Sequence, residues 1–132
     1  MRTAGIWHTP RRLVAAIVQA GGRGHGVLLS VPRTAEGRDA LAAHLACDPY
    51  LEVVVPLTLL RLDPIGRYLH RHRVAAWRVP DKLLHALVQI LQVRYCAAPT
   101  LARALARLPS TSLGDGLVIG PVPDPRQLAL LE

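Results

Sequence analysis

The pattern of apolar and polar residues divides the chain into an extended first third and a remainder with helical spacing. Three short apolar runs come first, at residues 3–8, 13–18 and 27–31. The second run is apolar at every position, which is typical of a strand buried on both faces. A glycine-rich stretch at 21–26 separates the second run from the third and favours a hairpin turn. The short connections predict an antiparallel meander of three strands.

Helical and extended patterns alternate after the meander. Thr34 can cap a helix, because its side-chain oxygen can accept a hydrogen bond from the free amide groups of a first turn. A β-branched run at 51–55 predicts a fourth strand. Asp63 is a favoured N-cap for a short helix at 64–72, and a fifth strand is expected at 74–79.

The last third is predicted to be mainly helical and to end in a stiff tail. Pro80 and Asp81 open the most clearly amphipathic helix. Its apolar stripe consists of Leu84, Leu87, Val88 and Leu91. A further helix begins near Pro99, and its inward side is expected to hold Leu101, Leu105 and Leu108. Residues 110–116 are expected to form a polar loop, and 117–119 a short strand or an extended arm before the proline-rich end.

The order of these elements predicts the fold class. It is βββαβαβα, followed by a helix and a tail, which indicates an α/β fold with a mixed sheet and helices on its faces. This is the order of the RNase H-like fold. We expect residues 1–109 to form one RNase H-like α/β domain. Residues 110–132 would be a loop and a proline-rich C-terminal extension of the same domain.

Composition limits the class of protein. Hydrophobic residues make up 51% of the 132 residues, but aromatic residues only 4%, and phenylalanine is absent, so the core is expected to be aliphatic. Cys47 and Cys96 form no CxxC pair and are expected to be buried thiols in a reducing compartment. Residues 1–10 hold no apolar signal-peptide core, and no run of about 18 apolar residues occurs. We therefore expect a cytoplasmic protein without a membrane span.

The charge distribution favours anionic partners. The formal net charge is +7 and the isoelectric point is about 10.7, which favours binding to DNA or RNA. Residues 67–73 are the densest basic segment and place an aromatic residue among arginines, as in surfaces that stack bases and follow phosphates. The alternative is the solvated face of a short helix. The candidate nucleic-acid-binding residues are Arg67, Tyr68, Arg71, Arg73, Arg11, Arg12, Arg103 and Arg107.

A set of short segments within residues 3–85 carries a family resemblance. The segments are AGI at 4–6, LVAA at 13–16, VPRTAEG at 31–37, LEVV at 51–54, GRYL at 66–69 and VAAWRVP at 74–80. They resemble the RuvC-like, RNase H-like N-terminal domain of Piv-type DNA invertases and of insertion-sequence transposases with a DEDD active site.

The resemblance implies divalent-metal chemistry on clustered carboxylates, but this chain departs from the family's pattern. In the family an aspartate follows a Gly-Ile pair on the first strand, whereas Trp7 and His8 follow that pair here. The fourth strand should end in a glutamate, whereas Pro56 follows the apolar run. The family's downstream pair of aspartates should lie at a Lys/Arg-rich helix start, whereas only Asp81 occurs near such a position here, and it fits a helix N-cap. The resemblance therefore implies a catalytically degenerate transposase domain with no catalytic residue, no metal ion and no cofactor.

Two other interpretations stay open. The mean hydropathy of +0.26 favours apolar surface for self-association, so the alternative is a structural or homo-oligomeric protein-interaction module without a nucleic-acid role. His70 and His72 are a close pair of metal-ligand residues, but no third ligand is evident. A metal-dependent nuclease with relocated carboxylates would draw on Asp63, Asp81, Asp115 and Glu52.

Overall fold

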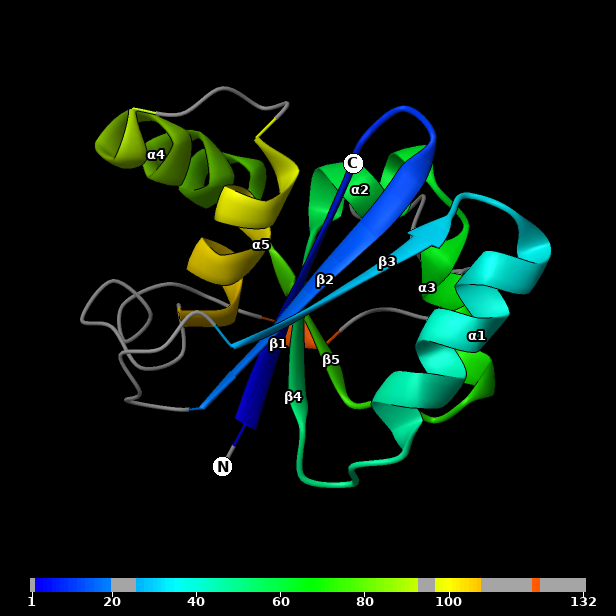
Figure 1. Cartoon of the computed structure of the whole chain (residues 1–132). Coiled ribbons are helices and arrows are strands. Elements are labelled where there is room, and N and C mark those ends of the chain that lie inside the picture. The colour runs from blue at the N-terminus through cyan, green and yellow to red at the C-terminus, as the bar shows by residue number, and fades with distance from the viewer. Residues whose placement is uncertain (1, 20–25, 93–96, 108–119, 122–132) are drawn as a thin grey trace.

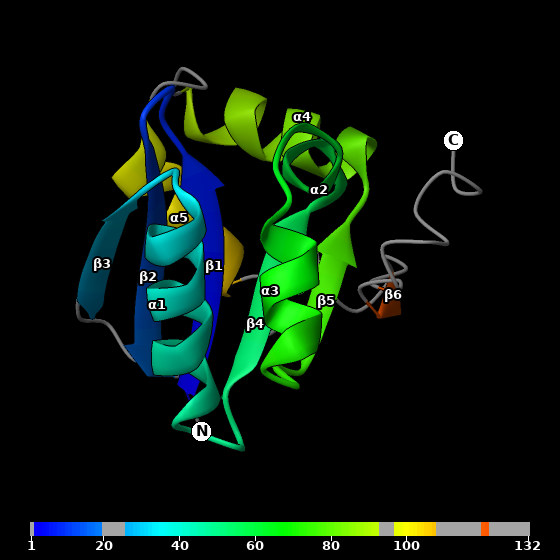
Figure 2. The same cartoon turned by 90° about the vertical axis from the view of Figure 1, so that its right-hand side faces the viewer.

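The strands form one mixed sheet. The computed structural model describes residues 2–19, 26–92, 97–107 and 120–121 (Figure 1). Within them six strands lie in the order β3-β2-β1-β4-β5-β6 (Figure 2). The strands are β1 (Arg2–His8), β2 (Arg12–Gln19), β3 (Val27–Pro32), β4 (Glu52–Pro56), β5 (Ala76–Val79) and β6 (Gly120–Pro121).

Strand β1 joins the antiparallel and parallel parts of the sheet. It pairs antiparallel with β2, from Arg2 opposite Gln19 to His8 opposite Leu13, and parallel with β4. On the outer sides, β3 pairs antiparallel with β2, and β5 pairs parallel with β4. The predicted three-stranded meander is confirmed. Because β1, β4 and β5 run in the same direction, their carboxyl ends lie at one edge of the sheet.

Helices cover both faces of the sheet. Figure 2 shows α1 (Ala35–Ala46) and α3 (Ile65–Arg71) side by side on one face, while α5 (Ala98–Arg107) packs across β1 and β2 on the other. Helix α2 (Leu57–Leu62) follows β4 at the carboxyl edge, and α4 (Asp81–Leu91) follows β5. The predicted class, an α/β fold with a mixed sheet and helices, is confirmed.

The core is aliphatic, as the composition predicted. The largest fully buried side chains are isoleucines, leucines and valines, and they come from both the strands and the helices. Trp7, at 3% exposure, is the one buried aromatic residue in the described part of the chain. Within the same residues, no helix is long and apolar enough to cross a membrane.

Helix α5 approaches the sheet closely because β1 carries a glycine. A Cβ atom at Gly5 would overlap the carbonyl oxygen of Ala102 and the amide nitrogen of Ala106. The hydroxyl group of Thr3 donates a hydrogen bond to the carbonyl oxygen of Ala106. Leu105, one position before, is fully buried. A side chain at residue 5 would therefore hold the helix away from the strands that it covers.

One helix had no counterpart in the sequence pattern. Residues 57–62 form α2, which buries Leu57, Leu59 and Leu60 after Pro56 ends the strand. A six-residue apolar run fits a strand or a helix equally well from its periodicity, so its burial in the tertiary structure decides between them.

The helix predicted at 64–72 is α3, which begins one residue later than predicted, at Ile65, and Asp63 makes the expected capping bond to its first turn. Pro64 directly precedes Ile65 and makes no side-chain capping bond. Asp63 lies at the junction of α2 and α3, and its side chain is completely buried. It still accepts a hydrogen bond from the amide of Ile65, at 2.9 Å. Its other acceptor positions face arginines from distant parts of the chain, which a local capping pattern does not reveal.

Smaller corrections concern single residues. Leu91 is 39% exposed, whereas Leu83 is buried, so the apolar stripe of α4 begins earlier than predicted. Cys47 is exposed rather than buried, because it follows the last turn of α1. The loop at 110–116, the extended stretch at 117–119, Leu108, Cys96 and Asp115 lie outside the described residues.

Replacing Gly5 with alanine should destabilise the fold. The added methyl group meets backbone atoms of α5, which cannot turn aside as a flexible side chain would. We expect a loss of about 2 kcal/mol in the free energy of unfolding, measured by urea denaturation. Gly66→Ala, inside α3, is the matched control and should be neutral or stabilising. Equal stability of Gly5→Ala and the wild type would refute the close packing of α5 on β1.

Candidate functional site

Part of the basic segment predicted at 67–73 forms an exposed cationic surface. Arg67 and Arg71 project from α3, and Arg73 follows its C-cap, His72. All three arginines are exposed, and in the described part of the chain none of their guanidinium groups contacts a carboxylate. These positive charges are therefore available to an anion from outside. We call Arg67, Arg71 and Arg73 the α3 arginines.

The backbone holds Arg73 in a conformation that suits glycine. Its φ is 56°, in the left-handed region. The amide of Arg73 donates to the carbonyl of His70, and the amide of Val74 donates to the carbonyl of Leu69. This pair of bonds is a Schellman motif, in which glycine is the usual residue at the left-handed position. An arginine there is less favourable for the backbone, by about 1 kcal/mol.

Tyr68 supports one of these arginines. The guanidinium carbon of Arg71 lies over the Tyr68 ring, 5.1 Å from its centroid. The ring is partly buried and packs against the core. A cation held on the face of an aromatic ring is attracted by the ring quadrupole. Tyr68 therefore fixes the position of a charged group rather than presenting a free ring.

The other predicted arginines do not join this surface. The guanidinium of Arg12 donates to the hydroxyl of Ser30 at 2.6 Å and to its carbonyl oxygen at 3.0 Å, which commits it to β3. Arg11 is exposed in the turn between β1 and β2. Arg103 and Arg107 belong to α5, on the opposite face of the sheet from α3, and are half-buried with partners of their own. Of the eight candidates, the structure brings together Arg67, Tyr68, Arg71 and Arg73.

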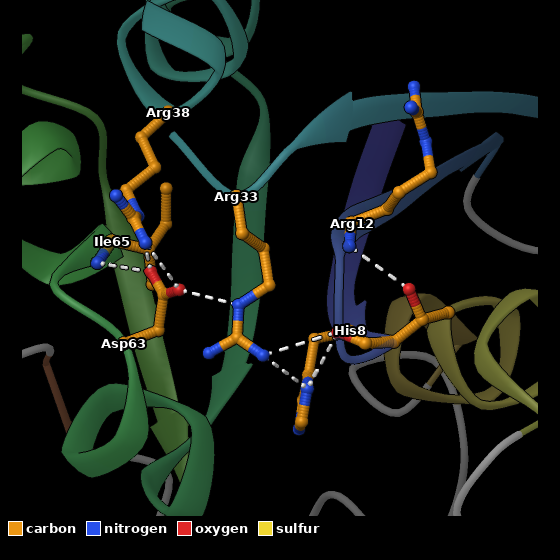
Figure 3. Close-up of polar contacts among 7 residues, drawn as sticks. His8, Arg12, Arg33, Arg38, Asp63 and Ile65 are labelled. Atoms are coloured by element: carbon orange, nitrogen blue, oxygen red, sulfur yellow. Dashed lines mark hydrogen bonds and ion pairs between the residues drawn. The ribbon is translucent and has the colours of Figure 1, made fainter. Parts of the chain in front are cut away.

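A second cluster, which the sequence pattern did not predict, centres on the buried carboxylate of Asp63. Oδ1 accepts from Nε of Arg38 at 2.9 Å, and Oδ2 accepts from Nη2 of the same residue at 3.1 Å. Nε of Arg33 donates to Oδ2 at 2.9 Å. The far side of the Arg33 guanidinium lies 3.2 Å from Nδ1 of His8 and donates to the carbonyl oxygen of Thr9. Figure 3 shows Arg33 between Asp63 and His8.

These contacts shift the titration of both acidic and basic members of the cluster. Burial alone would raise the pKa of Asp63, but hydrogen bonds from Arg38 and Arg33 outweigh it and hold the pKa below its usual 3.8. Burial lowers the pKa of His8 below 6.5, and the positive charge of Arg33 lowers it further. Asp63 is therefore ionised and His8 neutral at pH 7. Nδ1 of His8 lies 3.2 Å both from Nη1 of Arg33 and from the carbonyl oxygen of Thr9, so it accepts from the guanidinium in one tautomer and donates to the carbonyl in the other.

The Asp63 carboxylate has no acceptor position left for a metal ion. A carboxylate offers about four such positions, and the N–H groups of Arg33, Arg38 and Ile65 occupy all of them. Asp81 is exposed and already accepts from the Thr58 hydroxyl at 2.6 Å and from Arg61 at 2.9 Å. The carboxyl edge of the parallel strands is therefore occupied by internal ion pairs.

The remaining metal-ligand candidates are also dispersed. Glu52 begins β4, at the edge of the sheet opposite to Asp63 and Asp81. Nε2 of His72 lies 2.7 Å from Oδ1 of Asp39, so this histidine pairs with α1 rather than with His70. Among the described residues, no group of three or more histidine, cysteine, aspartate or glutamate side chains is placed to hold a metal ion.

The Asp63 cluster left only a weak signal in the sequence. Arg33 and Arg38 flank the cap of α1, and an Asp-Pro pair is fully explained by local helix capping. Arg33 and Arg38 lie 30 and 25 residues before Asp63, and separations of this length correspond to no local sequence motif. An arginine directly before a helix cap, with no neighbouring acid, was the one available hint.

Replacing Asp63 with asparagine should destabilise the protein at neutral pH. Two partly buried guanidinium groups lose their counter-ion, and breaking a buried pair by removing one partner costs about 3 kcal/mol. Chemical denaturation at pH 7 measures the loss. Asp48→Asn is the matched control, because its pair with Arg2 is exposed and should contribute little.

The ion pairs of Asp63 with Arg33 and Arg38 predict that the stability of the fold depends on pH. The folded pKa of Asp63 is lowered, so its contribution is present above pH 3.8 and is lost as the pH falls through the lower folded value. His8 adds an earlier loss below pH 6.5, where the unfolded chain takes up a proton that the folded chain resists. The Asp63→Asn variant should lack the step below pH 3.8. An unchanged acid profile in that variant would contradict the role of Asp63.

No protein-family model matches the chain, and no curated protein is significantly similar to it. The similarity to RuvC-like domains stays a prediction from the short segments within residues 3–85.

Proposed function

We propose that this chain is a non-catalytic RNase H-like domain that binds nucleic acid through the α3 arginines. The observation that carries the proposal is the grouping of three exposed arginines, Arg67 and Arg71 on α3 and Arg73 just after its C-cap, without a carboxylate partner among the described residues. Phosphate contacts from lysine and arginine supply most of the sequence-independent affinity of proteins for nucleic acid.

The arrangement of strands supports the RNase H-like part of the proposal. Strands β3, β2, β1, β4 and β5 are adjacent in that order, and β2 is antiparallel to the others. The order of elements along the chain keeps the predicted βββαβαβα pattern, with the short helix α2 added after β4.

The contacts at the carboxyl edge support the non-catalytic part. Where the family resemblance expects a carboxylate on the first strand, β1 ends in His8, which is neutral and contacts Arg33. Beyond β4, the acidic residue that comes first is Asp63, and its oxygens are bound by arginines. Carboxylates that are already neutralised by guanidinium groups cannot also neutralise divalent cations.

The energetic cost of the α3 arginines supports a ligand. Like charges on one short element repel each other, and Arg73 also occupies a left-handed backbone position. Among the described residues no carboxylate pairs with these arginines, because Asp39 contacts His72 and Asp63 pairs with Arg33 and Arg38. An anionic partner would relieve the repulsion and explain why the cations are kept.

Removing Arg67 and Arg71 together should abolish most of the binding. With about three phosphate contacts, log K should fall with log salt concentration with a slope of about −2 for a single strand and −2.7 for a duplex. The Arg67→Ala/Arg71→Ala variant should lose at least tenfold in affinity at low salt and shift the slope by about 1.4 on a single strand. Fluorescence anisotropy with labelled DNA and RNA at several salt concentrations measures both.

A charge-matched variant controls for net charge. Arg2→Ala/Lys82→Ala removes the same two positive charges from exposed positions away from α3. This variant should retain its affinity to within about twofold, since it removes no phosphate contact of the proposed surface. Equal losses in the two variants would mean that the net charge, rather than this surface, binds the probe.

Replacing Arg73 with glycine should separate stability from binding. Glycine adopts a φ of 56° without strain, so the variant should be more stable by about 0.5 kcal/mol or more. It also removes one phosphate contact, so its affinity should fall and its single-strand salt slope should weaken by about 0.7. Thermal unfolding and anisotropy on the same preparation give both quantities. A variant that gains stability and keeps full affinity would exclude Arg73 from the surface.

A second candidate function is self-association. Strand β3 lies at the edge of the sheet, and its first two residues, Val27 and Leu28, are 55% and 40% exposed. Exposed apolar side chains on an edge strand favour pairing with another chain. A dimer that persists at high salt, together with no affinity for nucleic acid, would favour this function over the first.

A further inference from the structure

The contact between Tyr68 and Arg71 indicates which chemical group of a nucleic acid the surface receives. The Arg71 guanidinium lies over one face of the ring, and the ring packs against the core. One face of the ring is therefore taken by Arg71, and the ring is only partly exposed. Arg71 is exposed, and its planar guanidinium is the group that the site presents beside the ring.

We propose that the ligand is single-stranded nucleic acid and that one of its bases stacks on the guanidinium of Arg71, with Tyr68 as the positioning residue beneath it. This inference rests on the proposed function of the α3 arginines. A guanidinium is planar and delocalised, and bases that are unstacked in single strands pack on such planes. In a duplex the bases are stacked on one another, so their faces are not available to this surface.

The tyrosine reduces the cost of ordering Arg71. A free arginine side chain has many rotamers, and immobilising one on binding lowers affinity. The cation–π contact already restrains Arg71 before any ligand arrives. The Arg71 guanidinium is thus already oriented for stacking on a base. A phosphate contact alone would require its positive charge but not a fixed orientation of its plane.

Arg67 provides the comparison within the same helix. It lies four residues before Arg71, so the two side chains leave α3 on the same side, about 6 Å apart along the helix axis. Arg67 makes no ring contact among the described residues. We assign Arg67 and Arg73 to phosphates, and Arg71 to a phosphate through its N–H groups and to a base through its planar face, so the three arginines would follow a short stretch of one strand.

The experiment compares arginine-to-lysine changes at the two positions on three probes. The probes are a labelled DNA single strand of about 15 nucleotides, a strand of the same length made of abasic sites, and the matching duplex. Lysine keeps the positive charge but lacks the planar guanidinium group. The wild type should bind the normal strand about tenfold more tightly than the abasic strand, since one stacked base is worth about that factor. Arg71→Lys should bring this ratio close to one, and Arg67→Lys should leave it unchanged.

Tyr68→Leu tests the positioning role. It retains an apolar side chain against the core but removes the ring beneath Arg71. Although Arg71 is still present, the ratio of the affinities for the normal and the abasic strand should fall as it does in Arg71→Lys. Its thermal unfolding is measured alongside. Should that variant unfold, the two exposed lysine variants decide the question by themselves.

The outcomes separate the two proposals. Equal affinity for normal and abasic strands, with binding still lost in Arg67→Ala/Arg71→Ala, would overturn stacking and leave the phosphate-binding function in place. Tighter binding to the duplex than to the single strand would likewise overturn it. Absence of binding to every probe at low salt would overturn the proposed function itself.

Discussion

The Asp63 carboxylate ties together segments of the chain that are distant in sequence. It belongs to the junction of α2 and α3, and it holds Arg33 from the link between β3 and α1 and Arg38 from the first turns of α1. Arg33 continues the connection to the end of β1 through His8. An ion buried without partners would be excluded from the interior, so these arginines are a condition for the junction to close. The position of α3 beside α1 depends on this junction.

The same interaction separates the structural charges from the available ones. Arg33 and Arg38 pair with Asp63, and Arg61 pairs with Asp81, so two carboxylates neutralise two of these three positive charges. The α3 arginines are not neutralised in this way by any described carboxylate, although they belong to the helix that the Asp63 junction orients. The net charge of +7 is therefore a poor guide to a binding surface by itself. What matters is which cations the fold leaves without a partner.

Most of the fold was predictable because its signals are local. Apolar runs bounded by proline and glycine marked β1 to β5 to within two residues at each end, and Thr34 caps α1 by accepting from the amide of Gly37, as its side chain predicted. Helix α2 was not predictable, because six residues of leucine-rich sequence have no distinctive period. The role of Asp63 was not predictable either. The helix cap alone already explained an aspartate before Pro64, and the two arginine partners of Asp63 lie 25 and 30 residues away.

The residues of the basic surface at α3 could be predicted from the sequence, but the way in which the tyrosine and the arginines are arranged could not. The sequence shows arginines around a tyrosine, and it suggests a ring that stacks on bases. The fold reverses these roles, because the partly buried ring packs against the core and the i, i+3 spacing places the exposed guanidinium of Arg71 over it. Helical geometry thus separates this basic segment into residues that contact phosphates and a residue that stacks on a base. Arg67 and Arg73 remain point charges for phosphates, while Arg71 becomes a fixed plane, and a fixed plane distinguishes a single strand from a duplex in a way that charge cannot.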